Sequence, residues 1–211
     1  MLLVKIKKMI TKMPSSLMLV LFLTTTSMNS AHSSEDDPLE PINRAVFGFN
    51  EVIDDVVLEP VAKGYKYVTP DPIEDSVSNF FNNLGEINTI INSTLQLKFD
   101  KTLSASGRLM INSTFGILGL FDVATKMGIE KHNEDFGQTL GYYGIPSGPY
   151  LVLPFFGPSS FRDAPSFFVD IQMEKEISPV HTELHHEERQ AIQATNVIDT
   201  RANLLQATKI L

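Results

Sequence analysis

The 211-residue chain contains no cysteine. Disulfides, thiol catalysis and cysteine-based metal sites are therefore excluded, and so is a lipid attached through a cysteine. Tryptophan is also absent, whereas phenylalanine occurs 14 times. The apolar segment at 109–124 is interrupted by polar residues and glycines, and it is shorter than the roughly 20 residues of a membrane-spanning helix. It fits a buried helix pair or an interfacial segment better.

Basic side chains are scarce beyond the N-terminus. Residues 1–31 contain four of the 17 lysines and arginines and no acidic residue, which leaves 13 basic against 25 acidic side chains in the rest of the chain. A nucleic-acid-binding domain needs a basic patch, and none is visible. Nucleic acid is therefore not an expected partner.

The N-terminus has the layout of a secretory signal peptide. A lysine-containing segment precedes the apolar core LMLVLFL, and small and polar residues follow it up to Ala31. An uncleaved anchor is the alternative, although this core is much shorter than a spanning helix. We predict a signal peptide at 1–31, a flexible lead at 32–36, and a single domain at 37–211.

Apolar residues three and four apart predict a mainly helical domain. A helix is expected from Ile42 or Asn43, and Pro60 is placed to start a second one. The sequence DPIE at 71–74 resembles a capping box that opens a longer helix. Asp100 is expected to cap the next helix, which should direct its apolar side chains inward: Leu103, Met110 and Ile111.

Further helices are expected over 166–176 and from about Glu187 to the end. Only 149–153 has the pattern of an extended segment, and no set of alternating runs predicts a sheet. Between these elements lies the stretch FGQTLGYYGIPSGPYLVLPFFGPSSFRD at 136–163, which combines glycine and proline with aromatic side chains. A linker would share the glycine and proline but not the aromatics. We interpret this stretch as irregular apolar backbone that is buried or faces a membrane.

No enzymatic motif is present. The sequence contains no GxSxG, Walker loop or GxGxxG, and 157–160 (GPSS) is not a nucleophile elbow. His181 and His185 are four residues apart, as two zinc ligands on a helix would be, but HExxH is absent and the surroundings are highly charged. A solvated segment explains them better. No catalytic residue, metal or cofactor is expected.

Two other patterns admit both a structural and a functional interpretation. Arg162 and Asp163 follow directly on the apolar stretch. They fit a buried pair or an ordinary helix start, which we favour, or an arginine directed at a phosphate. Asparagines at 79, 83, 88 and 92 form pairs four apart along one helix. Surface exposure is the favoured interpretation, and the lining of a polar lumen is the alternative.

Three segments resemble the MlaA/VacJ family, outer-membrane lipoproteins of the bacterial phospholipid-trafficking system. They are DPLEPINRAVFGFN at 37–50, SNFFNNLGEINTIIN at 78–92, and the stretch at 136–163; TRANLL at 200–205 agrees as well. Family members usually carry a lipobox cysteine after the signal peptide, which this sequence does not contain. Membrane residence is then expected to depend on amphipathic helices, the apolar stretch and porin contact.

The resemblance implies an all-helical, ring-like protein within the inner leaflet of the outer membrane, with an amphipathic channel. It implies association with a porin trimer and transfer of mislocalised outer-leaflet phospholipid to a soluble periplasmic carrier. One alternative is a porin-associated structural adaptor that moves no lipid. Another is a lipid hydrolase, but this sequence contains no nucleophile motif that would support it. The matched segments supply candidates for the lipid path or its gating: Phe47, Phe49, Asn50, Asn79, Asn83, Tyr142, Tyr143 and Arg162.

Overall fold

The computed structural model describes residues 39–178, 180 and 183–208. The predicted signal peptide and lead lie outside these residues. Most of the described chain is helical, and it contains one short β-hairpin. The mainly helical architecture predicted from the sequence is therefore confirmed.

The first three elements form one continuous helical rod. Helix α3 (Glu40–Ile53) passes through a π-helical segment, η1 (Asp54–Leu58), into α4 (Glu59–Val68). Pro41 and Pro60 both lie in first turns. At Pro41, in the first turn of the rod, the absent N–H leaves no helical bond unmade. The helix predicted near Ile42 is confirmed with an earlier start. Pro60 begins α4 as predicted, but the wider π turn joins the two helices without a break.

Helices α5 (Asp71–Leu95) and α6 (Phe99–Thr114) follow, joined by a short connection. The predicted capping box is wrong, because no side chain caps α5. Glu74 instead accepts a hydrogen bond from Lys66 at 2.7 Å, which closes the corner between α4 and α5. Asp100 lies inside the first turn of α6 and does not cap it either.

The rest of the chain forms shorter elements. They are α7 (Val123–Lys126), α8 (Phe136–Tyr142), strands β1 (Tyr150–Leu153) and β2 (Gly157–Ser160), α9 (Asp163–Ile177) and α11 (His186–Thr208). The helices near 166–176 and from Glu187 are thus confirmed with earlier starts. The two strands pair antiparallel, with Val152 opposite Pro158. The expectation of no sheet is wrong here, because glycine and proline in β2 conceal the second strand.

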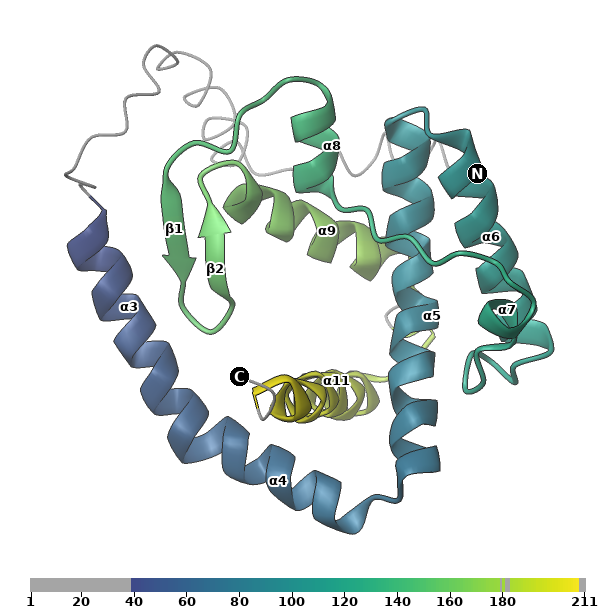
Figure 1. The fold of residues 1–211 in the computed structure, drawn as a ribbon, viewed down its shortest axis with the longest axis horizontal. Helices are drawn as coiled ribbons and strands as arrows, with labels where there is room; N and C mark the ends of the chain where they lie inside the picture. Colours follow the sequence, from purple (N-terminus) through teal and green to yellow (C-terminus); the bar gives the residue numbers. More distant parts are fainter. Residues whose placement is uncertain (1–38, 179, 181–182, 209–211) are drawn as a thin grey trace.

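These elements have a ring-shaped outline. In Figure 1, α3 and α4 form one side, α5 forms the opposite side, and α9 with the hairpin lies between them. Helix α6 lies outside α5, and α11 lies inside the outline, strongly foreshortened in this view. None of the described helices has both the length and the hydropathy required to cross a membrane.

The distribution of polarity is inverted relative to an ordinary water-soluble fold. Polar and charged residues outnumber apolar ones among the buried described residues, and the apolar ones are mostly alanine and valine. Large apolar side chains are instead exposed along α3, α6 and the loop after α6. The predicted inward direction of Leu103 and Met110 is wrong, since they are 73% and 68% exposed. The inward side chains of α6 are Ala105, Arg108 and Asn112.

Arg108 is the centre of a buried charged cluster between α5, α6 and α7. Its Nε donates to Glu86 at 2.7 Å and its Nη2 donates to Asp122 at 2.9 Å, while its Nη1 donates to Thr125 and to the Ile129 carbonyl. Arg108 and Glu86 are each 2% exposed. Buried charges are tolerated when they are paired and hydrogen-bonded. A guanidinium has five N–H donors, and Arg108 uses four of them here.

Helix α11 is joined to the rod and to α5 by polar side chains. Arg201 donates through two nitrogens to the carboxylate of Asp54 in η1. Two residues earlier, Asp199 is buried and accepts from Tyr65 of α4 and Ser78 of α5. These contacts determine where α11 lies inside the ring outline.

Candidate functional site

The first group of candidate residues lies where α3 meets the hairpin. Asn43 donates to the Tyr150 carbonyl at 3.0 Å and accepts from the Val152 N–H at 2.9 Å. One full heptad later, Asn50 donates to the Leu153 carbonyl at 2.9 Å and accepts from the Phe155 N–H at 2.8 Å. We call this contact the α3–β1 seam. It closes the ring outline without a covalent link.

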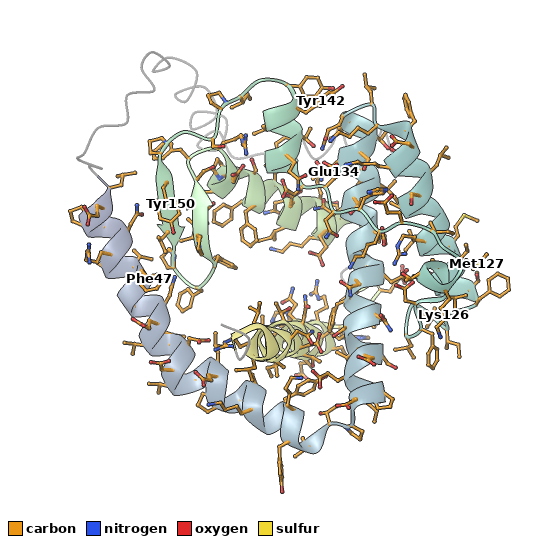
Figure 2. The ribbon with its side chains drawn as sticks, in the orientation of Figure 1. Phe47, Lys126, Met127, Glu134, Tyr142 and Tyr150 are labelled. Carbon is orange, nitrogen blue, oxygen red and sulfur yellow. The ribbon has the colours of Figure 1, made fainter. Side chains whose placement is uncertain are left out.

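Aromatic side chains lie beside these hydrogen bonds at the seam. Phe49 contacts Phe155 edge to face, with ring centroids 5.3 Å apart. Phe47 and Tyr150 lie close together between α3 and β1 (Figure 2), where they line a shallow groove of about 250 Å³. Phe47, Phe49 and Asn50 are therefore brought together at the seam, and their role in a lipid path or its gating stays a prediction.

The second group, Asn79 and Asn83, joins α5 to the neighbouring segment. Asn79 donates to the Leu120 carbonyl and Asn83 donates to the Ser113 hydroxyl. Asn83 is buried beneath Gly119, where a Cβ would lie 2.6 Å from the asparagine side chain. The expected surface exposure is wrong for Asn83 and for Asn92, which are 4% and 0% exposed. Two of the four asparagines are therefore interior, whereas Asn79 and Asn88 are half-buried.

Arg162 lies beneath α8 and forms the pair with Asp163 that the structural interpretation expects. Its Nε donates to Asp163 at 2.7 Å and its Nη1 donates to the Ile145 carbonyl at 3.2 Å. A Cβ on Gly137 would lie 2.5 Å from the Asp163 carboxylate, and one on Gly141 would lie 2.7 Å from Arg162. The two glycines, four residues apart, thus allow α8 to rest directly on the ion pair. A contact between Arg162 and a headgroup stays a prediction.

Tyr142 and Tyr143 end α8 at the periphery of the molecule. Both are exposed, and Figure 2 shows Tyr142 at the outer edge of the ring outline. The Lys98 ammonium lies 5.6 Å from the centre of the Tyr142 ring, and the Tyr143 hydroxyl donates to the Leu95 carbonyl. An aromatic ring with a polar tip in this position suits a membrane–water interface.

The principal cavity lies between α5, α9, α11 and the segment that leads into α8. Its volume is about 430 Å³. One part of its wall is apolar, with Phe81, Leu84 and Phe167, and the other part is polar, with Asn88, Asp135 and Asp170. None of the eight candidate residues from the sequence lines this cavity. We call it the inner cavity.

Asp170 is the most distinctive residue of the inner cavity. Its carboxylate accepts the N–H of Phe136 at 3.1 Å and the amide of Asn92 at 3.3 Å. Burial raises the pKa of Asp170, and its hydrogen bonds offset only part of this effect. Asp170 also borders a second cavity of about 220 Å³ beneath the hairpin, together with Phe167. A sequence signal existed for it, namely one carboxylate within the apolar run SFFVDIQM.

Glu134 lines the same cavity from the loop before α8. Its Oε1 accepts from Lys98 and Lys101 at 3.1 and 2.7 Å. Burial would raise the pKa of Glu134, but the hydrogen bonds from Lys101, Gln96 and Lys98 outweigh burial and lower it. Its Oε2 is buried and has no hydrogen-bond partner among the described residues.

Only one member of the histidine pair lies within the described residues. His185 is exposed and lies 3.5 Å from Glu188, while His181 lies outside the described residues. Among the described residues, one group of carboxylates is close enough to share an ion: Asp54, Asp55 and Glu59. Arg201 already contacts Asp54 and Glu59, and Lys63 pairs with Glu59, so the chain itself offsets part of the charge of this group.

Comparison with known proteins gives a consistent assignment. A family model described as MlaA lipoprotein matches residues 35–211. An uncharacterized protein of Rickettsia typhi is 48% identical over 127 residues, which cover 60% of this chain and 51% of that protein. The intermembrane phospholipid transport system lipoprotein MlaA of Haemophilus influenzae is 37% identical over 142 residues, which cover 65% of this chain and 56% of the relative.

The fold comparison agrees with the sequence comparison. A chain from a solved structure described as "Structural basis for maintenance of bacterial outer membrane lipid asymmetry" matches with a TM-score of 0.69 and 32% identity. The match covers 83% of this chain and 88% of the solved one. The aligned part of this chain spans about half the length of the Rickettsia typhi relative. The chain belongs to the MlaA lipoprotein family.

Proposed function

We propose that this protein is a component of intermembrane phospholipid transport. In this proposal it resides at the periplasmic face of the outer membrane, takes up phospholipid that has reached the outer leaflet, and passes it to a soluble periplasmic carrier. A porin trimer is the proposed membrane partner. The names of the family relatives support the general role, and the direction and the partners are part of the proposal.

The inverted distribution of polarity is the observation that carries the proposal. Water-soluble domains rarely expose a contiguous apolar surface, and they almost never bury arginine or glutamate fully. Here the rod formed by α3 and α4, the loop after α6 and the end of α8 expose large apolar side chains, whereas Arg108 and Glu86 are buried. This arrangement suits a protein whose outer surface contacts acyl chains. The described helices would then lie in one leaflet, since none can cross a bilayer.

The inner cavity supports a role in which lipid is moved without chemical change. Exposing one acyl CH₂ group to water costs about 0.8 kcal/mol. Two chains of about fifteen such groups each therefore cost on the order of 20 kcal/mol. A path with an apolar wall and a polar wall lowers this barrier, because chains and headgroup each find a suitable surface. The inner cavity has both walls.

Transfer of a fluorescent phospholipid from proteoliposomes to the purified carrier tests the proposal. Gly85 lines the inner cavity, and nothing lies within 4 Å of a Cβ at this position. Gly85→Phe should therefore obstruct the cavity and reduce the transfer rate severalfold. Gly64 in α4 is equally open and does not line the cavity, so Gly64→Phe is the matched control.

Three results would contradict the proposal. Absence of transfer by the unmodified protein, with porin binding intact, would favour the structural adaptor. Equal transfer rates for Gly85→Phe and Gly64→Phe would show that lipid does not pass through the inner cavity. Release of fatty acid during the assay would instead indicate a hydrolase.

A further inference from the structure

Four residues of the described chain combine a left-handed backbone with a large exposed apolar side chain. They are Leu97, Ile117, Leu118 and Phe155, with φ values of 59°, 51°, 56° and 69°. No other described residue except glycine has a positive φ. Their side chains are mostly exposed, at 62%, 59%, 71% and 67%. Glycine or asparagine is the usual occupant of this conformation, because larger side chains collide with the backbone.

Leu97 occupies a position at which helix ends usually carry glycine. It directly follows Gln96, the C-cap of α5. The Leu97 N–H donates to the Thr94 carbonyl at 3.1 Å. The next N–H, that of Lys98, donates to the Ser93 carbonyl at 2.9 Å. These two hydrogen bonds form a Schellman motif, and leucine at its left-handed position costs conformational free energy that glycine would avoid.

The loop after α6 has the same feature at two consecutive positions. Ile117 and Leu118 are left-handed, and Gly119 follows them with a φ of 93°. A positive φ is a genuine outlier for a β-branched residue such as isoleucine. The Leu118 N–H donates to the Ser113 carbonyl at 3.0 Å and the Gly119 N–H donates to the Asn112 carbonyl at 2.8 Å. Backbone hydrogen bonds therefore hold this turn, while the apolar side chains point away from the packed interior.

In water these positions would carry two costs at once, a strained backbone and a hydrated apolar side chain. Phe155 has a partner within the chain, because its ring contacts Phe49 at the seam. Leu97, Ile117 and Leu118 are more than half exposed, so packing within the chain offsets little of their cost. A surrounding outside the chain that removes these side chains from water would offset it.

The two strained segments lie at opposite ends of α6, which is on the outside of the ring outline (Figure 1). Between them, Leu103 and Met110 are two turns apart on the helix and are 73% and 68% exposed. Helix α6 thus exposes apolar side chains at both ends and along its length. We call the set of five residues the α6 edge: Leu97, Leu103, Met110, Ile117 and Leu118.

The neighbours of the α6 edge indicate a lipid layer as its partner. At one end, Tyr143 is exposed and its hydroxyl donates to the carbonyl of Leu95, two residues before Leu97. At the other end, Lys126 and Met127 are exposed at the periphery of the molecule (Figure 2). Apolar side chains flanked by tyrosine and lysine are typical of a membrane–water interface, where the polar tips reach the headgroups.

We infer that the α6 edge inserts into the acyl layer of a phospholipid membrane, and that insertion offsets the conformational cost of the left-handed Leu97, Ile117 and Leu118. A fluid acyl layer suits anchors at separate turns, because it contacts any apolar side chain without a preformed pocket. This inference rests on the proposed function, which places the protein at a membrane.

Tryptophan fluorescence tests the insertion directly, because the chain contains no tryptophan and a single introduced one is then the only reporter. Leu97→Trp and Leu118→Trp are bound to vesicles of phosphatidylethanolamine and phosphatidylglycerol. We expect both to lose fluorescence when the acyl chains are brominated, since bromine quenches tryptophan on contact. Glu187→Trp is the control, because Glu187 is exposed in the acidic first turn of α11 and should stay unquenched.

A second pair of variants tests the offset between strain and insertion. Leu97→Gly should weaken vesicle binding about tenfold, because an inserted side chain is lost. The same variant should raise the Tm in detergent by about 2–4 °C, because glycine relieves the strained backbone. Leu103→Ala is the matched control. It removes an equally exposed apolar side chain from regular helix, so it should weaken binding without raising the Tm.

The outcomes separate the inference from the proposed function. Vesicle binding with both tryptophans unquenched overturns the inference and leaves a membrane location intact. Blue-shifted emission without quenching would assign the α6 edge to contact with protein, and overturns it as well. A Tm that falls for Leu97→Gly would show that the left-handed leucine carries no conformational cost to offset. Failure of the unmodified protein to bind vesicles overturns the proposed function and the inference together.

Discussion

Arg201 and Asp54 form a two-pronged ion pair, with Nε 2.6 Å from Oδ1 and Nη2 2.7 Å from Oδ2. The two residues are 147 positions apart in the chain. Asp54 is the first residue of the π-helical segment, so the pair fixes α11 at the point where the rod changes its helical pitch. A planar guanidinium suits this geometry, and a lysine ammonium does not.

Replacement of Arg201 by lysine should destabilise the protein although it preserves the charge. The variant loses one of two parallel hydrogen bonds in a mostly buried pair, which we expect to cost about 1 kcal/mol of unfolding free energy. Thermal unfolding in detergent measures this loss. Arg44→Lys is the control, because the pair of Arg44 with Glu40 is exposed and should contribute little. Similar Tm values for both variants would show that the pair does not determine the position of α11.

The asparagines of the seam should control the mobility of the hairpin. Asn43→Ala removes the acceptor of the buried Val152 N–H and the donor to Tyr150, and should cost about 1–3 kcal/mol. Hydrogen exchange at the amides of Val152 and Phe155 should accelerate, most strongly in the double variant with Asn50→Ala. Asn79→Ala, which removes a bond to Leu120 far from the seam, should leave these amides protected. Unchanged exchange in the double variant would rule out the seam as the closure of the ring.

Removal of the buried guanidinium should be among the most damaging single changes. Arg108→Met leaves Glu86 and Asp122 without their cation, and breaking a buried pair in this way costs about 3–5 kcal/mol. A lower Tm, or failure to fold, is the expected result. Lys126→Met, at an exposed site one turn from Asp122, should have a small effect. If adding Glu86→Leu to Arg108→Met restores no stability, the unpaired Glu86 is not the cause of the loss.

Asp170 and Asp163 should influence stability in opposite directions as pH changes. Burial raises the pKa of Asp170. For Asp163, burial acts in the same direction, but the hydrogen bonds from Arg162 and Ser160 outweigh it and lower the pKa. When the pKa of a carboxyl is raised in the folded state, the stabilisation that it contributes is fully present below its unfolded-state pKa of about 3.9. This stabilisation is lost as the pH rises through the folded-state pKa. When the pKa of a carboxyl is lowered in the folded state, the stabilisation that it contributes is present above its unfolded-state pKa of about 3.9. This stabilisation is lost as the pH falls through the folded-state pKa.

Asp170→Asn should therefore raise the Tm at pH 7 and have little effect near pH 3, whereas Asp163→Asn should lower the Tm at pH 7. Thermal unfolding across this pH range measures both. A lower Tm for Asp170→Asn at pH 7 would show that its carboxylate is needed for folding rather than tolerated for function.

The loop between α6 and α7 should contribute to membrane attachment. Phe115 and Leu118 are 76% and 71% exposed, and each is worth about 1.5–3 kcal/mol when transferred out of water. The double variant Phe115→Asp with Leu118→Asp should reduce binding to phospholipid vesicles at least about tenfold in a flotation assay. Thr114→Asp places one charge at an adjacent exposed polar position and is the control. Unchanged flotation of the double variant would exclude the loop from the membrane contact.

The sequence predicted the elements well and their orientation poorly. The spacing of apolar residues in 99–114 predicted a helix, and α6 occupies this range. Its inward face was predicted wrongly, because apolar periodicity shows that a helix has two faces but not which solvent each face contacts. In the structure Leu103 faces outward and Arg108 faces inward, which is the reverse of the order expected in water.

The site was less predictable than the fold. The candidate residues came from short matched segments, and the structure distributes them over the seam, the α5–α6 contact and α8. Asp170 belongs to the inner cavity because α9 packs against the segment preceding α8, which is a long-range relationship. Local propensity contains no information about such a contact. The lone carboxylate in an apolar run was the one local signal.

At the seam, the four hydrogen bonds of the two asparagines all go to backbone atoms of the hairpin. An amide recognises any residue that presents a carbonyl and an N–H, so the closure of the ring places few demands on the identity of the hairpin residues. The hairpin can therefore diverge in sequence, for example to match a different membrane or partner, while the two asparagines keep it in register.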